Sequence, residues 1–193
     1  MTKLAAIVLT LLFALPTFAA ELELRYAALQ RIIAEQVFTQ EGRHYVRGNK
    51  AARCQYAYLE TPRIGADGDR LSVAARFSGR SALDVFNRCI GLGDSFDLVI
   101  TACPVPRSGG IGFKDVKVTT AKDSYYIRRV RAALTHSFSK DFKIEVRDQA
   151  RSLLEQSRDD STYKQELAAF DLGDIRVTPD ALVLVVEFRL VVK

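Results

Sequence analysis

The side chains that could do chemistry are few in this 193-residue chain. Its two histidines, His44 and His136, lie far apart in the sequence and form neither an H-x-x-x-H nor an H-E-x-x-H pair. Its three cysteines include no C-x-x-C pair of the kind that a redox centre or a structural zinc site commonly uses. The sequence therefore predicts no metal site and no cofactor.

A catalytic nucleophile has little support either. The stretch Gly93-Asp94-Ser95 is similar to the Gly-Asp-Ser start of one lipase and esterase class, but it lies mid-chain and no Asp-x-x-His follows near the C-terminus. The paired acids Asp159 and Asp160 lie in a polar stretch, where we expect neither carboxyl group to be buried enough for acid–base catalysis. We therefore expect no enzyme, because catalysis would need a pocket that brings Ser95 or a histidine to a base.

Basic residues are gathered in one part of the chain. Three arginines and three lysines are close in sequence, namely Arg128, Arg129, Arg131, Lys114, Lys117 and Lys122. One interpretation is a patch that binds an anionic membrane surface or a protein partner, and the alternative is the solvated face of an amphipathic helix. The formal net charge of +5 is mild, and the chain does not interleave basic and aromatic residues, so nucleic acid is not an expected partner.

The first 19 residues have the pattern of a cleavable signal peptide. Lys3 precedes an apolar run too short to span a bilayer, and the small residues Thr17 and Ala19 stand where a signal peptidase reads the chain. Cleavage after Ala19 leaves residues 20–193, which we expect to fold as a single domain. No cysteine stands at the cleavage site, so we predict a periplasmic or secreted protein without a lipid anchor.

The first half of the mature chain predicts a helix followed by an antiparallel meander. Residues 22–38 have helical spacing and are expected to form an N-terminal helix. Residues 81–89 are expected to form a short helical connection that begins at a Ser cap. Alternation of apolar and polar side chains predicts strands at residues 54–59, 71–77, 96–102 and 111–120.

The meander also determines which cysteines can pair. In an oxidising compartment, three cysteines imply one bridge and one free thiol. The strand that starts near Cys54 places this residue at the same end of the predicted sheet as Cys89, whereas Cys103 lies at the opposite end. We therefore predict a Cys54–Cys89 disulfide.

A second helical region follows the meander. Apolar side chains keep helical spacing over about 28 residues, with a break expected near Ser139 because β-branched residues follow it. Residues 166–170 are expected to add a short helical turn, and residues 175–177 and 181–192 a final hairpin. The predicted fold class is α+β: a curved antiparallel sheet wrapped around a long, kinked helix, with an N-terminal helix and a C-terminal hairpin.

The second half of the chain resembles a known superfamily. The strand Ile111-Gly112-Phe113-Lys114-Asp115-Val116-Lys117-Val118 leads directly into the long helical region, and the chain ends with Gly173-Asp174-Ile175-Arg176-Val177-Thr178-Pro179-Asp180-Ala181-Leu182-Val183-Leu184. Over residues 111–192 this pattern resembles the tubular lipid-binding (TULIP) superfamily, in particular its uncharacterised bacterial envelope members. The resemblance implies a curved sheet rolled around a helix, with an apolar groove or tube that takes acyl chains. Many of these relatives are lipoproteins, whereas this chain lacks the anchoring cysteine.

The inward face of the expected sheet and helix supplies the candidate ligand contacts. We expect apolar residues there to line the groove, namely Phe77, Phe96, Leu98, Ile100, Phe113, Ile127, Val130, Leu134, Phe138, Leu184, Val186 and Phe188. The same pattern also fits a filled core. The sequence thus supports a non-catalytic protein that binds a lipid or other hydrophobic ligand or, alternatively, a ligand-free adaptor that acts through its surface. A cavity large enough for an acyl chain favours the first hypothesis.

Overall fold

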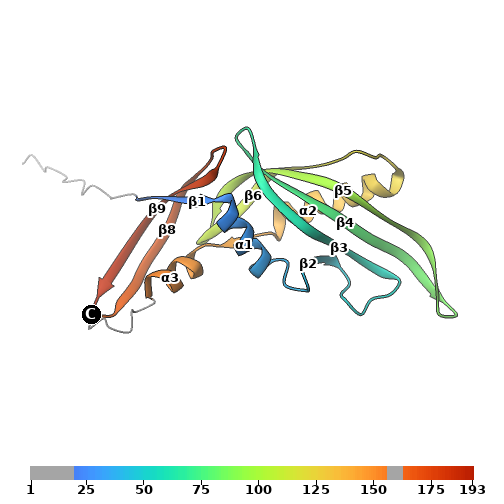
Figure 1. Cartoon of the computed structure of the whole chain (residues 1–193), viewed down its shortest axis with the longest axis horizontal. Helices are drawn as coiled ribbons and strands as arrows, with labels where there is room; N and C mark the ends of the chain where they lie inside the picture. The colour runs from blue at the N-terminus through green and yellow to red at the C-terminus, as the bar shows by residue number, and fades with distance from the viewer. Residues whose placement is uncertain (1–19, 156–162) are drawn as a thin grey trace, which may run out of the picture.

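The computed structural model describes residues 20–155 and 163–193. The predicted signal peptide at residues 1–19 and the acids Asp159 and Asp160 lie outside the described residues. The fold is α+β, as predicted: mostly antiparallel strands form a strongly curled half-barrel, accompanied by few helices (Figure 1). None of the helices in the described ranges is long and apolar enough to cross a membrane.

The larger sheet is a six-stranded meander in the order β2-β3-β4-β5-β6-β7. Its strands are β2 (Arg43–Arg47), β3 (Gln55–Asp67), β4 (Arg70–Val85), β5 (Arg88–Arg107), β6 (Gly110–Thr120) and β7 (Ile144–Glu145). Leu71, Ala75 and Phe77 of β4 are buried on the concave face, and Phe77 pairs with the buried Phe96 of β5. The strands predicted from alternation are confirmed, and β3, β4 and β5 are longer than predicted.

Residues 81–89 do not form the predicted helical connection. β4 instead continues to Val85 and β5 begins at Arg88, so the two strands meet at a two-residue turn of Phe86 and Asn87. Both turn residues have positive φ, 50° and 63°, as a type I′ hairpin turn requires. The apolar spacing was misleading here because cross-strand pairing with β5 determines the conformation.

The predicted Cys54–Cys89 disulfide is confirmed, with a Cα–Cα distance of 5.2 Å. It joins β5, close to the turn, to the segment that precedes β3. The N–H of Ala82 also donates to the carbonyl of Cys54 (2.9 Å), so both strands of the hairpin are attached to this segment. Cys103 is the free thiol, and its Sγ accepts a hydrogen bond from Nη1 of Arg70 (3.3 Å).

The second helical region is interrupted after Lys140, next to the break predicted near Ser139, but a short strand separates the two helices, so they do not form one long kinked helix. α2 (Tyr125–Lys140) begins at Ser124, whose hydroxyl accepts a hydrogen bond from the N–H of Ile127 (3.2 Å). After α2 ends, β7 pairs with β6, and α3 (Arg147–Glu155) follows. The β-branched Ile144 is fully buried in β7, where it gains sheet hydrogen bonds that a continued helix would not allow.

The smaller sheet has three strands in the order β1-β9-β8. Its strands are β1 (Ala20–Arg25), β8 (Gln165–Val177) and β9 (Ala181–Val192). The helix predicted for residues 22–38 is shorter, because α1 spans Tyr26–Gln36 and the residues before it form β1. Leu22 pairs with Leu184 of β9, so β1 forms one edge of this sheet.

Residues 166–170 lie in strand β8, which corrects the predicted helical turn. Irregular pairing occurs between Leu167 and Ala169 and again between Leu172 and Asp174. These bulges shift the buried side chains away from strict alternation, so that Leu167 and Phe170 are both buried although they are three residues apart. A spacing of three residues is typical of a helix, which explains the wrong prediction.

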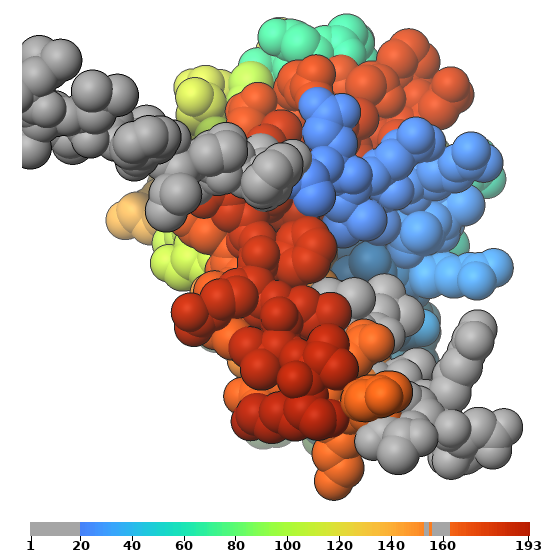
Figure 2. All heavy atoms as spheres, turned by 90° about the vertical axis from the view of Figure 1, so that its left-hand side faces the viewer, coloured from blue at the N-terminus to red at the C-terminus, as the bar shows by residue number. Residues whose placement is uncertain are grey.

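One apolar core joins the two sheets and the helices. α1 contributes Leu29 and Ile33, and α2 contributes Ile127, Leu134 and Phe138. β8 packs against β5 and α3, which attaches the smaller sheet to the larger one. Figure 2 looks at the smaller sheet from outside, where β9 occupies the middle of the face and β1 with α1 lies beside it.

Candidate ligand groove

A cavity of about 440 Å³, here called the groove, lies between α2 and the concave face of the larger sheet. Its sheet wall includes Val46 of β2, Ala57 of β3, Phe77 of β4 and Leu92 of β5. Small-molecule sites in proteins occupy about 300–1,000 Å³ and are mostly apolar, so the groove has the size and the lining of such a site.

Helix α2 forms the opposite wall of the groove. Tyr126, Val130, Ala133 and Leu134 line it and recur at spacings of three and four residues along one helix face. Leu134 is buried against the core, whereas Ala133 is exposed. Because the alanine side chain is small, the helix does not fill the space above the sheet at this position.

Gly79 of β4 permits the close approach of Tyr126 to the sheet. A Cβ atom at position 79 would lie 2.6 Å from the ring of Phe77 and 2.9 Å from Oη of Tyr126. Burial raises the pKa of Tyr126, and the nearby Asp94 carboxylate raises it further. The phenol therefore keeps its proton at neutral pH and is available as a hydrogen-bond donor beside an apolar cavity.

Three arginines, Arg47, Arg80 and Arg129, also line the groove. Nη2 of Arg47 donates to Oε1 of Gln55 (3.0 Å), and Nε of Arg129 donates to Oη of Tyr125 (3.2 Å). None of the ion pairs found among the described residues involves these three arginines. The groove therefore combines an apolar lining with positive charge, an arrangement that suits an amphiphile with an anionic head.

The structure brings three of the residues predicted as ligand contacts into the groove. These three are Phe77, Val130 and Leu134. Ile100, Phe113 and Phe138 lie instead around a separate internal void of only about 20 Å³, which is too small for a ligand. Contact of the first three with a ligand stays a prediction.

The remaining predicted contacts lie elsewhere. Phe96, Leu98, Ile127, Leu184 and Val186 are buried in the core. Phe188 of β9 is 46% exposed and lines a surface hollow on the smaller sheet, together with Arg147 and Arg189. Alternation thus identified the inward face correctly for most positions, but it could not show which part of that face is left open.

Sequence reasoning missed several residues of the groove. Arg80 and Leu92 flank the segment that was expected to be helical, so their strand positions were not recognised. Tyr126 lies four residues before Val130, and this spacing on an amphipathic helix is the signal that could have identified it. Ala133 gives no such signal, because a small residue on a helix face is compatible with either contact or open space.

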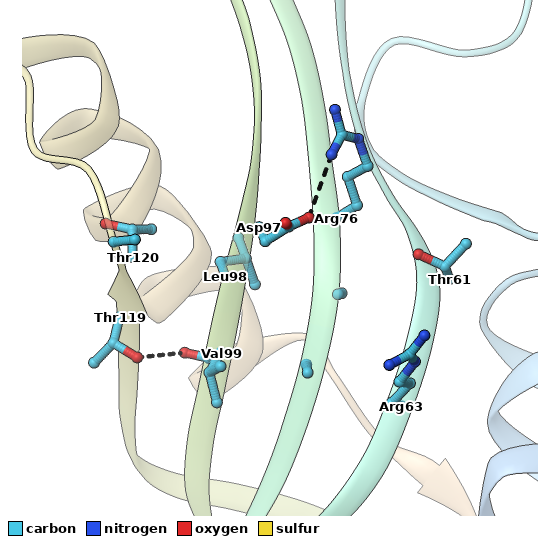
Figure 3. A pocket seen from close by; sticks show the side chains of 11 residues that line it. Thr61, Arg63, Arg76, Asp97, Leu98, Val99, Thr119 and Thr120 are labelled. Carbon is cyan, nitrogen blue, oxygen red and sulfur yellow. Dashed lines mark hydrogen bonds and ion pairs between the residues drawn. The ribbon is translucent and has the colours of Figure 1, made fainter.

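A second hollow, of about 530 Å³, lies on the outer face of the larger sheet (Figure 3). Cross-strand partners Arg76 and Asp97 form an ion pair across it (3.4 Å), and the hydroxyl of Thr119 donates to the carbonyl of Val99 (3.3 Å). Both contacts join neighbouring strands and are ordinary surface interactions of a sheet. The apolar groove is therefore the candidate ligand site.

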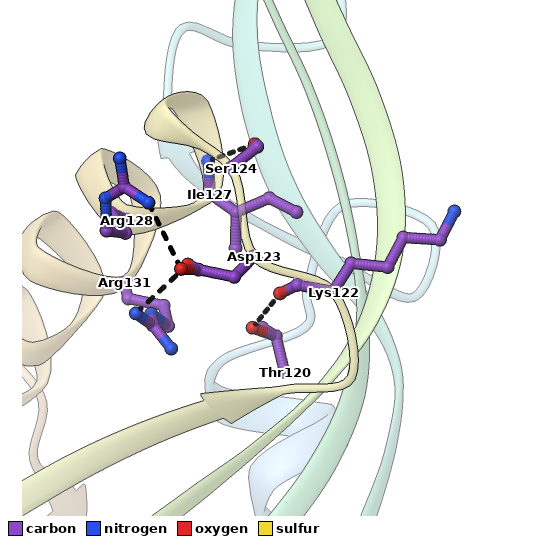
Figure 4. A network of polar contacts seen from close by, with 7 residues as sticks. All are labelled: Thr120, Lys122, Asp123, Ser124, Ile127, Arg128 and Arg131. Atoms are coloured by element: carbon purple, nitrogen blue, oxygen red, sulfur yellow. Dashed lines mark hydrogen bonds and ion pairs between the residues drawn. The ribbon is translucent and has the colours of Figure 1, made fainter.

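The sequence cluster of basic residues is partly neutralised in the structure (Figure 4). The carboxylate of Asp123 forms ion pairs with Arg128 (3.1 Å) and Arg131 (3.4 Å) at the start of α2. Arg129, between them in sequence, lines the groove and lies over the ring of Tyr125. Positive charge from this cluster is thus available at the groove through Arg129.

The candidate catalytic side chains have structural partners. The hydroxyls of Ser95 and Ser78 form a hydrogen bond across β4 and β5 (2.9 Å). His44 lies 6.0 Å from the ring of Phe38 and 6.2 Å from that of Phe142, and its Nδ1 contacts the carbonyl of Val37 (3.2 Å). Burial lowers the pKa of His44. Within the described ranges, no group of three or more metal-ligating side chains is placed to hold a metal ion.

No protein-family model, no curated protein and no solved structure matches this chain.

Proposed function

We propose that this chain is an exported, non-catalytic protein that binds a lipid or other amphiphile with its apolar part in the groove. The observation that carries the proposal is the groove of about 440 Å³ between α2 and the concave sheet, with apolar walls and Arg47, Arg80 and Arg129 along them. Burial of apolar surface supplies about 25 cal/mol per Å² before the cost of association, and the arginines favour an anionic head.

An extracytoplasmic location is supported by the Cys54–Cys89 disulfide, because such bonds form and persist in oxidising compartments. We propose that residues 1–19 are the signal peptide that exports the chain to the periplasm or beyond. A distant relation to the TULIP superfamily is also part of the proposal. Its support is the combination of a curled antiparallel sheet, a helix on the concave face and an apolar groove between them.

Native mass spectrometry of the protein purified from its own compartment tests the proposal first. A bound amphiphile at one molecule per chain, released by organic extraction, is the expected result. If the protein carries no such mass and also fails to bind added anionic and neutral amphiphiles, the alternative of a ligand-free adaptor replaces the proposal.

A matched pair of variants tests whether the groove is the site. Ala132 and Ala133 are adjacent, exposed residues of α2, but only Ala133 lines the groove. Ala133→Trp places an indole in the cavity and should weaken binding of a fluorescent fatty acid by about tenfold, which equals about 1.4 kcal/mol. Ala132→Trp should bind the probe as the native protein does. Equal affinities of the two variants would show that the ligand lies elsewhere.

A further inference from the structure

The end of the β4–β5 hairpin, residues 82–92, projects beyond its neighbouring strand and is here called the finger (Figure 1). β3 pairs with β4 only as far as Ser81. Four apolar side chains of the finger are strongly exposed: Leu83 (68%), Phe86 (97%), Ile90 (62%) and Leu92 (63%). Neighbouring exposed apolar side chains of this kind mark a surface that contacts a protein partner or a membrane.

The apolar side chains of the two strands share the concave face of the sheet. Leu83 of β4 pairs with Ile90 of β5. Two residues closer to the core, Ser81 of β4 pairs with Leu92 of β5. Because side chains alternate along a strand, Leu83 and the buried Phe77 point to the same side. The apolar surface is therefore continuous from the core, through the groove that Leu92 lines, to the finger.

The opposite face of the finger is partly covered, at Ala82 and Cys89, by the segment before β3. Cys89, which alternates with the exposed Ile90, is bonded to Cys54, and Ala82 is only 6% exposed. Nη2 of Arg53 donates to the carbonyl of Asn87 at the turn (3.3 Å). These contacts support the finger from one side and leave its apolar face open.

The turn itself places an aromatic residue where the backbone disfavours it. Phe86 has a φ of 50° and Asn87 one of 63°. Type I′ turns favour Asn, Asp or Gly at both positions, and a bulky residue is uncommon there. A strained residue whose side chain is almost fully exposed gains nothing from packing in the folded chain, so its placement points to a contact outside the chain.

We propose that the finger docks on an anionic bilayer, with Phe86 and Leu83 inserted at the level of the lipid headgroups. Arg53, Arg80 and Arg88 lie in the finger or beside it, where they outnumber the acidic Asp84. Further along β5, Asp94 is a second acid, so the finger region remains net positive. Exposed apolar side chains with flanking arginines are the combination that binds an anionic membrane surface.

The shape of the finger favours a bilayer over a folded protein partner. A specific protein interface buries about 800 Å² on each partner, which calls for a broad surface. A projecting two-residue turn offers little area to another folded protein, whereas a fluid bilayer interface can surround it on all sides. This inference does not require the groove to be occupied.

Co-sedimentation with phosphatidylcholine vesicles, with and without phosphatidylglycerol, tests the proposal. The native protein should bind the phosphatidylglycerol vesicles more tightly, and added salt should weaken this binding. Phe86→Asn should lower the partition coefficient about tenfold, because the inserted apolar surface is lost. Since Asn suits the turn, this variant should melt no lower than the native protein.

A second variant and a matched control distinguish insertion of the finger from a general effect of losing exposed apolar surface. Leu83→Ser should also weaken vesicle binding about tenfold, whereas Val192→Ser removes a comparably exposed apolar side chain (58%) at the far end of β9 and should have no effect. Equal binding by all four proteins, or failure of the native protein to bind either vesicle, would overturn the proposal. So would self-association of the native protein in sedimentation velocity that Phe86→Asn abolishes, because a second copy would then cover the finger.

The test also separates the finger from the groove. Ala133→Trp should bind phosphatidylglycerol vesicles like the native protein while losing the fluorescent fatty acid. Phe86→Asn should show the reverse behaviour. If Phe86→Asn instead bound vesicles normally but lost the fatty acid, the finger would be part of the ligand site and the membrane proposal would be wrong.

Discussion

Removal of the Cys54–Cys89 disulfide should destabilise the protein by about 4 kcal/mol. The bridge closes a loop of 35 residues that contains β3, β4 and the turn. In the chain-entropy model, a loop of this length restricts the unfolded chain by an amount worth about 4 kcal/mol at 25 °C. This is a large part of the about 5–15 kcal/mol that usually stabilises a domain.

Urea denaturation of the double variant Cys54→Ala/Cys89→Ala measures this loss. Both proteins should carry Cys103→Ala, so that the free thiol cannot exchange with the bridge. The background substitution removes only the weak hydrogen bond from Arg70 and should change the unfolding free energy by less than about 1 kcal/mol. Hydrogen exchange should show faster exchange of the Ala82 amide, whose acceptor is the carbonyl of Cys54.

A loss below about 1 kcal/mol in the double variant would refute this reasoning. It would mean that the segment before β3 is held to the finger by its backbone contacts alone, or that the unfolded chain is already restricted. An unchanged rate of exchange at Ala82 would indicate that the backbone contacts hold the segment.

Three further predictions concern single residues. Gly91→Ala should cost about 1–3 kcal/mol in thermal unfolding, because its Cβ would lie 2.4 Å from a carbonyl oxygen of β4, whereas Gly65→Ala meets no atom within 4 Å and should be nearly neutral. Tyr26→Phe should cost about 1 kcal/mol by urea denaturation, since it removes the hydrogen bond to the carbonyl of Thr178 (2.6 Å). Because His44 has a lowered pKa in the folded state, the unfolding free energy should fall as the pH drops below about 6.5, and His44→Gln should flatten this dependence.

The parts of the fold that sequence predicted correctly are those in which local pattern and tertiary contact agree. In β4, Leu71, Ala75 and Phe77 alternate with residues that are mostly polar, and the concave face buries all three. The same agreement allowed the disulfide to be predicted, because the meander places Cys54 and Cys89 at one end of the sheet. Regular alternation is therefore enough to predict a strand and its inward side chains when one face of that strand is buried.

The incorrect elements are those that depend on partners distant in sequence. Leu22 joins a strand only because β9 offers an edge to it, and Ile144 joins one because β6 does. In β8, bulges give Leu167 and Phe170 a helix-like spacing. Local spacing contains no information about such pairing, which is determined by tertiary contacts that override propensity.

The candidate site, like the fold, could be predicted from the sequence only in part. Phe77, Val130 and Leu134 were predicted from their inward position, which periodicity reveals. The open space itself depends on small residues, Gly79 and Ala133, that let Tyr126 approach the sheet and leave room beside α2. Periodicity specifies the direction of a side chain but not whether the facing residue fills the gap.

The groove and the finger follow from one mismatch of lengths. The 16 residues of α2 extend about 24 Å at the rise of an α-helix, whereas the 20 residues of β5 extend about 66 Å as a strand. A helix of this length covers only part of the concave face along β4 and β5, and β6 pairs with β5 only from Leu98 onward. The apolar pattern nevertheless continues past the end of this cover, at Leu92, Ile90 and Leu83. A chain that extends an apolar sheet face beyond its own helix leaves a surface that only something outside the chain can bury, and we propose an amphiphile for the groove and a bilayer for the finger.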